Sequence, residues 1–98
     1  MIKSQVYIAR RGDNEIAQAE MQRLSDFSMA QLVERYNDVA RKGFFGSHAQ
    51  GLHVAALHHT MKKVFGKSPI TIGGGGHLIE LEGGEIVLVG DQWEYFFS

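Results

Sequence analysis

The sequence predicts an α+β fold: a short N-terminal strand and helix, a capped helix pair, then a 3-4-stranded antiparallel β-meander packed on the helices. Two segments open with the same serine-led helix cap, and apolar residues then recur at helical spacing. After Ser68 the apolar spacing changes to every second residue, which is typical of strands. A chain of 98 residues is long enough for one core, so we treat 1–98 as a single domain.

The amino-terminal segment is predicted to form a strand followed by a helix. Residues Gln5 to Arg10 are rich in β-branched and aromatic side chains, which favours a strand. Asp13 or Asn14 is expected to cap the helix that follows. The apolar residues of that helix are Ile16, Ala17, Met21 and Leu24.

The clearest predicted helix begins after Ser28, where Ser28 and Gln31 form a capping box, and ends at Gly43. Asp38 precedes Lys42 by four residues, the favourable order for an ion pair on a helix. Its apolar stripe comprises Met29, Leu32, Val33, Tyr36, Val39 and Ala40.

A second cap of the same form, Ser47 to Gln50, predicts a helix that runs to about Phe65. The short connection between the two helices predicts that they pack as neighbours. The apolar arc of the second helix comprises Val54, Leu57, Met61, Val64 and Phe65.

Glycine-containing turns predict the strand register of the remaining third. A turn at Gly83-Gly84 would pair Leu81 with Ile86 and Ile79 with Leu88. A turn at Gly90-Asp91 would pair Leu88 with Trp93 and Ile86 with Tyr95. A loop formed by the four glycines 73–76 would pair Ile72 with His77 and Ile70 with Ile79.

This register gives the meander two unlike faces. The face expected to meet the helices carries Ile70, Ile72, Ile79, Leu81, Ile86, Leu88, Trp93 and Tyr95, with His77 at its margin. The other face carries Thr71, Leu78, Glu80, Val87, Val89, Glu94 and Phe96. Four of those seven are apolar, more than a solvated face normally shows, so we expect another element or another molecule to cover it.

The four glycines raise the alternative of a phosphate-binding loop. Such a loop leads into a helix amino terminus, whereas these glycines lead into HLIEL, which alternates like a strand. We therefore interpret them as a hairpin loop.

Composition narrows the class of protein. There is no cysteine, which excludes disulfides and thiolate metal sites and is consistent with the cytoplasm. The net charge of -1 gives no overall attraction to phosphate, and no apolar run is long enough for a membrane helix. The segment at the amino terminus lacks the pattern of a signal peptide, so we expect no export.

The titratable residues form no pattern of an active site or a metal site. His48, His53, His58 and His59 are not spaced by three or four along the helix, so they do not form chelating pairs. No GxSxG or HExxH motif frames the serines, histidines and acids. We expect no enzymatic activity, no metal and no cofactor.

Two binding hypotheses remain, and the first is binding to a protein partner or to a second copy of the chain. The expected contacts are Leu78, Val87, Val89, Phe96, Phe44 and Phe45. The alternative is a nucleic-acid site at the carboxyl-terminal ends of the two main helices. Its residues would be Arg41, Lys42, Lys62, Lys63 and Lys67, although cations there also complement the helix ends.

Overall fold

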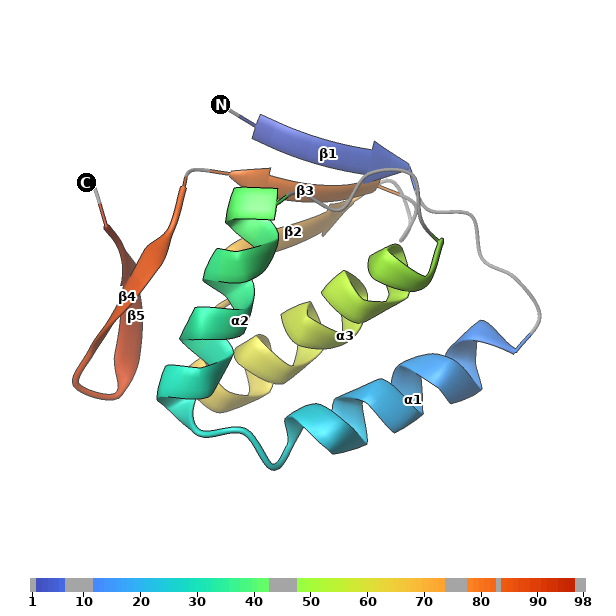
Figure 1. The fold of residues 1–98 in the computed structure, drawn as a ribbon, viewed down its shortest axis with the longest axis horizontal. Helices are drawn as coiled ribbons and strands as arrows, with labels where there is room; N and C mark the ends of the chain where they lie inside the picture. The colour runs from blue at the N-terminus through green and yellow to red at the C-terminus, as the bar shows by residue number, and fades with distance from the viewer. Residues whose placement is uncertain (1, 7–11, 43–47, 74–77, 83, 97–98) are drawn as a thin grey trace.

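The structure is a computed structural model that describes residues 2–6, 12–42, 48–73, 78–82 and 84–96, with the backbone alone for 2–6, 48 and 82. Within these ranges the chain forms three helices and five strands (Figure 1). They are β1 Ile2–Val6, α1 Asp13–Leu24, α2 Met29–Lys42, α3 His48–Phe65, β2 Ile70–Gly73, β3 Leu78–Glu82, β4 Ile86–Val89 and β5 Gln92–Tyr95. The predicted α+β class is confirmed, because three helices precede four strands that form two antiparallel hairpins against the helices.

The predicted strand at Gln5 to Arg10 lies mostly outside the described residues, and β1 extends only to Val6. The backbone of β1 pairs antiparallel with β3, with Val6 opposite Leu78. A strand that continues to Arg10 stays a prediction.

The carboxyl-terminal strands do not form one meander. Two sheets are present in the described residues, one with the strand order β1-β3-β2 and one formed by β4 and β5. The predicted pairs of Leu81 with Ile86 and Ile79 with Leu88 were therefore wrong. At Gly84 the chain bends away from β3 instead of folding back along it, because glycine accepts a change of direction as readily as a tight turn.

The predicted register of the last hairpin is confirmed, with Leu88 opposite Trp93 and Ile86 opposite Tyr95. Gly90 in its turn has a φ of 65°, a conformation that favours glycine. In the first hairpin Ile70 lies opposite Leu81 and Ile72 opposite Ile79, two residues away from the predicted register. A shift of two leaves every side chain on its predicted face, because strand side chains alternate with a period of two.

Residues 74–77, which include His77, lie outside the described residues. The strands before and after this segment, β2 and β3, are antiparallel partners. The glycine-rich segment therefore connects two strands and does not lead into a helix, in agreement with its interpretation as a hairpin connection.

The core joins both hairpins to all three helices. Leu32, Leu57, Ile79 and Trp93 belong to one buried cluster, so the predicted apolar face does meet the helices. Its other buried sheet residues are Ile70, Leu81 and Ile86, and Ile72 and Tyr95 are half-buried. Leu88 was assigned to this face but is 37% exposed, because it lies near the tip of β4–β5, beyond the helices.

Helix α2 follows its predicted cap and stripe, and α3 follows most of its predicted apolar arc. In the capping box the Gln31 N–H donates to Ser28 Oγ (3.1 Å) and the Ser28 N–H donates to Gln31 Oε1 (2.8 Å). Ser47 and Gly43 lie outside the described residues. Val64 was expected in the apolar arc of α3 but is 41% exposed, whereas the rest of that arc is buried.

The cap of α1 differs from the prediction. Gly12 occupies the cap position with a φ of 89°, and no side chain makes a capping hydrogen bond there. Neither Asp13 nor Asn14 caps the helix, because the helix begins at Asp13 itself. The apolar residues of α1 are also divided, with Leu24 buried, Met21 half-buried and Ile16 56% exposed.

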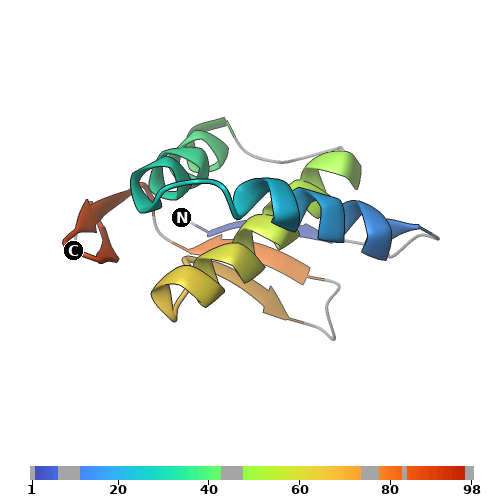
Figure 2. The ribbon, with the colours of Figure 1, turned by 90° about the horizontal axis from the view of Figure 1, so that it is seen from below.

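In space, α2 and α3 lie beside the three-stranded sheet, and α1 runs alongside α3 (Figures 1 and 2). The β4–β5 hairpin stands at one end of the molecule next to α2, and the start of α1 is at the other end. Among the described residues no helix has the length and apolar character to cross a membrane.

Candidate functional site

Among the described residues of the predicted contact surface, the large exposed apolar side chains, Val89 and Phe96, are carried by the β4–β5 hairpin and the residue that follows it. Asn37 of α2 holds the free edge of β4 with two hydrogen bonds. Its Nδ2 donates to the carbonyl oxygen of Ile86 (2.8 Å), and its Oδ1 accepts the Ile86 N–H (2.7 Å). Beside this pair, Arg41 and Glu85 form an ion pair of 2.7 Å. One helix side chain thus satisfies the backbone groups that a neighbouring strand would otherwise pair.

The other side of the hairpin is held by the end of α3. Gln92 Nε2 donates to the carbonyl oxygen of Phe65 (2.8 Å), and Trp93 Nε1 donates to that of Lys67 (3.0 Å). The ammonium group of Lys67 lies 4.7 Å from the centroid of the Trp93 ring, within the range of a cation–π contact. The first bond satisfies a carbonyl that the helix end leaves without an intrahelical partner, and the second satisfies a carbonyl of the segment just beyond the helix.

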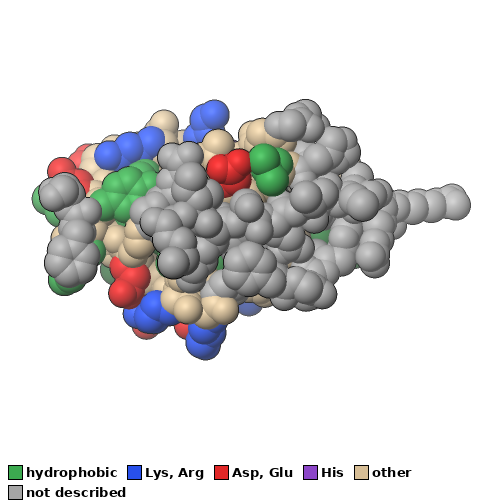
Figure 3. All heavy atoms as spheres, turned by 90° about the horizontal axis from the view of Figure 1, so that it is seen from above, with side chains coloured by type: hydrophobic (Ala, Val, Ile, Leu, Met, Phe, Trp, Pro, Cys, Tyr) green, Lys and Arg blue, Asp and Glu red, His purple; other side chains and the backbone are tan. Residues whose placement is uncertain are grey.

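The outer face of the hairpin is exposed at Val89, Glu94 and Phe96, whereas Gln92 on the same face reaches the end of α3. The register places Val87, Val89 and Phe96 on this outer face, opposite the buried Ile86 and Trp93. Val89 is 51% exposed and Phe96 is 59% exposed, and Val87 is half-buried. In the space-filling view, hydrophobic side chains reach the surface at the end of the molecule that carries the hairpin (Figure 3). We call Val87, Val89 and Phe96 the hairpin surface.

The remaining predicted contacts lie elsewhere. Leu78 is half-buried in β3, which belongs to the three-stranded sheet, so it does not continue the hairpin surface. Phe44 and Phe45 fall outside the described residues. The predicted single face is divided because β3 and β4 do not pair.

The five basic residues of the nucleic-acid hypothesis divide into two groups. Arg41 and Lys42 are at the carboxyl end of α2, and Lys62, Lys63 and Lys67 are at or beyond that of α3. These two helix ends lie apart in both ribbon views (Figures 1 and 2). Both cations of the first group are paired, Arg41 with Glu85 and Lys42 with Asp38 at 3.0 Å.

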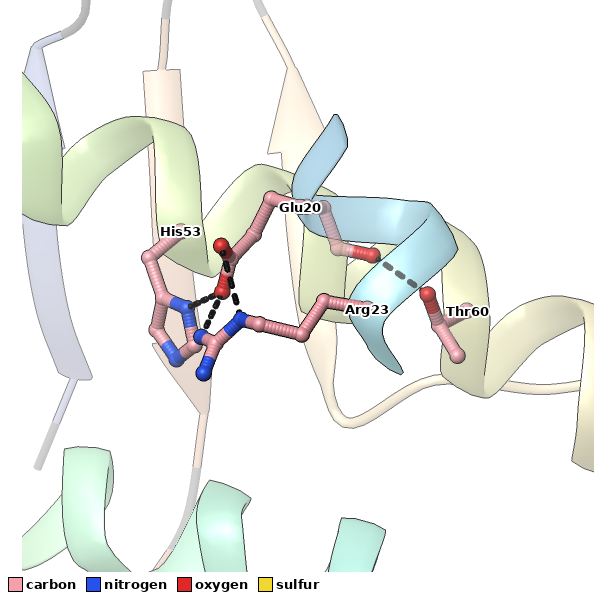
Figure 4. A network of polar contacts seen from close by, with 5 residues as sticks. Glu20, Arg23, His53 and Thr60 are labelled. Carbon is pink, nitrogen blue, oxygen red and sulfur yellow. Dashed lines mark hydrogen bonds and ion pairs between the residues drawn. The ribbon is translucent and has the colours of Figure 1, made fainter. Parts of the chain in front are cut away.

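A polar cluster that the sequence did not reveal joins α1 to α3. Glu20 Oε1 lies 2.6 Å from Nδ1 of His53, and the Arg23 guanidinium donates to both carboxylate oxygens of Glu20. Figure 4 shows the Glu20 carboxylate between the imidazole and the guanidinium. The side chains of Glu20 and His53 are 21% and 16% exposed, so the contact is largely shielded from water.

The charges of this cluster shift the pKa of Glu20 downward and that of Arg23 upward. The hydrogen bond from Arg23, followed by that from His53, holds the pKa of the Glu20 carboxyl below its ordinary value, although partial burial opposes the shift. Glu20 and Arg23 are three residues apart on α1, so their pairing could have been expected. The partner His53 is 33 residues further on, and no local pattern connects it to Glu20.

A second histidine stabilises the connection between α3 and β2. Nδ1 of His58 lies 3.0 Å from Oγ of Ser68, and the same Oγ accepts the N–H of Ile70 (3.1 Å). Burial, with a smaller contribution from His59, lowers the pKa of His58. In the tautomer with an unprotonated Nδ1, His58 accepts a hydrogen bond from the Ser68 hydroxyl.

A serine bonded to a neutral imidazole is also how a nucleophile and its base are arranged. No acidic side chain among the described residues contacts His58 to orient it, and Ser68 Oγ is already engaged by the backbone of Ile70. We therefore interpret this contact as structural. No group of three His, Asp or Glu side chains suited to a metal ion occurs in the described part of the chain.

Tyr36 is a buried polar group inside the core. Its side chain is fully buried, and its hydroxyl has no hydrogen-bond partner in the described structure. Burial raises the pKa of this phenol far above its ordinary value, with a further contribution from Tyr95. Tyr36 therefore stays neutral and acts as a large core residue between α2 and the hairpin.

Comparisons with family models, with curated proteins and with solved structures find no match to this chain.

Proposed function

We propose that this chain is a small non-enzymatic protein-binding domain, and that it binds a partner protein or a second copy of itself through the hairpin surface. The observation that carries the proposal is the exposure of Val89 and Phe96, by 51% and 59%, on one side of a firmly docked hairpin. Burying a large apolar side chain completely stabilises a complex by about 1.5–3 kcal/mol relative to leaving it in water.

The attachment of the hairpin supports a binding role. Asn37, Gln92 and Trp93 fix the strands to two different helices, so the exposed side chains are held in a defined arrangement before any partner arrives. A surface that is already ordered loses less conformational entropy on binding than a mobile one. Of these three residues, Trp93 lies on the inner face, whereas Gln92 is opposite Val89 and shares its face, so we expect the partner to contact the outer face at Val89 and Phe96.

Binding to nucleic acid has less support. A phosphate backbone is best held by several cations on one surface, but Arg41 and Lys42 lie apart from Lys62 and Lys63 and are paired with acids. For the location of the protein we propose the cytoplasm, supported by the absence of cysteine from the sequence.

The test separates self-association from binding to another protein. Sedimentation velocity of the wild type over a concentration series should show a dimer if the hairpin surface binds itself, and Val89→Ser with Phe96→Ser should return it to monomer. Ile16→Ser is the matched control, since Ile16 is 56% exposed on α1 and should leave the association unchanged.

If the wild type is monomeric at every concentration, the partner is a different protein. Immobilised wild type should then retain a protein from the native cell extract that the Val89→Ser and Phe96→Ser double variant does not retain, whereas Ile16→Ser retains it. Equal behaviour of the wild type and the double variant in both experiments contradicts the proposal.

A further inference from the structure

A second surface lies between α1 and α3, away from the hairpin. The two helices leave a groove of about 910 Å³ between them. This volume is within the range of about 300–1,000 Å³ that is usual for ligand sites. Residues of both helices line it; we call the polar side chains of α1 its rim, and the apolar residues of both helices together with Thr60 its floor.

The rim carries a row of three carboxamides. Asn14, Gln18 and Gln22 are four residues apart in sequence, so they follow one another along the same side of α1. All three are exposed, and their side chains make no hydrogen bond to another described residue. Each carboxamide therefore has a donor and an acceptor available for a ligand.

The same protein shows what a helix carboxamide can do with an extended chain. Asn37 binds both the N–H and the carbonyl oxygen of Ile86, a residue in a strand. A carboxamide therefore recognises one extended residue through its backbone, whatever the side chain of that residue.

The spacing of the row fits an extended chain. Four residues of helix rise by about 6 Å, and two residues of a strand advance by about 6.6 Å. Only every second residue of a strand turns its N–H and carbonyl toward one side. Three carboxamides at this spacing match the first, third and fifth residues of a five-residue extended segment.

The floor of the groove is apolar. It includes half-buried Met21 of α1 and Val64 of α3, which is 41% exposed although its neighbours in the α3 arc are buried. Thr60 also lines it, but its hydroxyl donates to the carbonyl oxygen of Ala56 (2.9 Å). The floor thus offers contact for apolar side chains rather than hydrogen bonds.

The charges of the groove select against an ionic ligand. Its charged lining residues are Glu15 and Lys63, and their opposite charges give the groove no net charge. An uncharged ligand therefore fits better than a nucleic acid or an acidic peptide.

We propose that the groove between α1 and α3 binds an extended, uncharged peptide segment of a partner protein. Asn14, Gln18 and Gln22 bind the backbone of alternate residues, and apolar side chains of the segment contact Met21 and Val64. This site is independent of the hairpin surface and does not rest on it.

The test uses a panel of five-residue peptides, acetylated and amidated, in which serine alternates with valine, leucine or phenylalanine. They are titrated into the 15N-labelled full chain. At least one should shift the side-chain NH2 signals of Asn14, Gln18 and Gln22. Gln18→Met keeps the length and helix propensity of the residue but removes the amide, and should weaken binding about fivefold to tenfold.

Two controls make the result specific. Glu34→Met, at an exposed position of α2 outside the groove, should bind the peptide like the wild type. A peptide methylated on its backbone nitrogens should not bind, because it has lost its donors. The proposal is overturned if no peptide shifts these signals, if the methylated peptide binds equally well, or if a single-stranded oligonucleotide shifts them and the peptides do not.

The outcome is separate from that of the hairpin experiment. The Val89→Ser and Phe96→Ser double variant should bind the peptide with unchanged affinity, because neither residue lines the groove.

Discussion

The two hairpins of this protein are held to the helices in different ways. The β2–β3 hairpin lies in a sheet with Ile70, Ile79 and Leu81 buried against the helices, and its β3 edge pairs with the backbone of β1. Among the described residues, the β4–β5 hairpin pairs with no further strand, and side chains such as Asn37 connect it to the helices. A strand edge can therefore be completed either by another strand or by a single polar residue of a helix.

The largest expected effect tests whether the two hairpins unfold together. Ile79→Ala in β3 and Ile86→Ala in β4 each remove a side chain that is 1% exposed. Each should lower the free energy of unfolding by about 2–5 kcal/mol, through lost burial and the cavity left behind. Denaturant unfolding measures the loss in each variant. Tryptophan fluorescence follows the β4–β5 hairpin, and circular dichroism follows the helices.

If the β4–β5 hairpin were a separate unit, Ile86→Ala would loosen Trp93 while leaving the helical signal unchanged. Coincident transitions in the two signals for both variants support a single cooperative unit. Transitions that separate only in Ile86→Ala would contradict it.

A smaller effect is expected when the side-chain attachment of β4 is removed. Asn37→Ala leaves the N–H and carbonyl of Ile86 without their partner, which should cost about 1–3 kcal/mol and speed the hydrogen exchange of the Ile86 amide. Asn14→Ala, at an exposed position of α1, should change stability by less than about 0.5 kcal/mol. Unchanged protection of the Ile86 amide in Asn37→Ala would show that this edge is held by other contacts.

The smallest effect on stability is expected at the polar cluster of Glu20, Arg23 and His53 between α1 and α3, which lies outside both hairpins. The pKa of Glu20 is lower in the folded protein than its ordinary value of 4.5, chiefly because of Arg23. The stability from this carboxylate is therefore present above about pH 4.5 and is lost as the pH falls through the lower folded pKa. Glu20→Gln removes this dependence, with a loss on the order of 1 kcal/mol at neutral pH.

Thermal unfolding between pH 7 and pH 3 checks this prediction. The difference in stability between the wild type and Glu20→Gln should shrink below pH 4.5. A difference that stays constant across the range would mean that Glu20 does not gain from its charge in the folded state.

Local patterns were enough to predict most of the fold. The capping box at Ser28 and Gln31, the stripe of α2 and the turn at Gly90 each depend on residues close together in sequence, and each is confirmed. Alternation also placed Ile79 and Trp93 on the buried side, even where the register of β2 and β3 was two residues off.

The errors arose where distant residues decide the structure. Whether the chain turns back along β3 or leaves the sheet before β4 depends on the residues against which β4 packs, and one of these, Asn37, lies 49 residues before Ile86. The same limit explains why part of the candidate site was missed. Val89 and Phe96 were predicted from alternation alone, but the separation of Leu78 from them and the contact of His53 with Glu20 required the fold.

Asn37 also bears on how this protein avoids aggregation. An uncovered strand edge invites strands of other molecules to add to it, and proteins usually protect such edges with charge, bulges or covering segments. Here one helix amide occupies the N–H and the carbonyl of Ile86 at the start of β4, so this part of the edge is protected without any added length of chain. A substitution at this residue would therefore expose the molecule to intermolecular strand pairing before it unfolds the body.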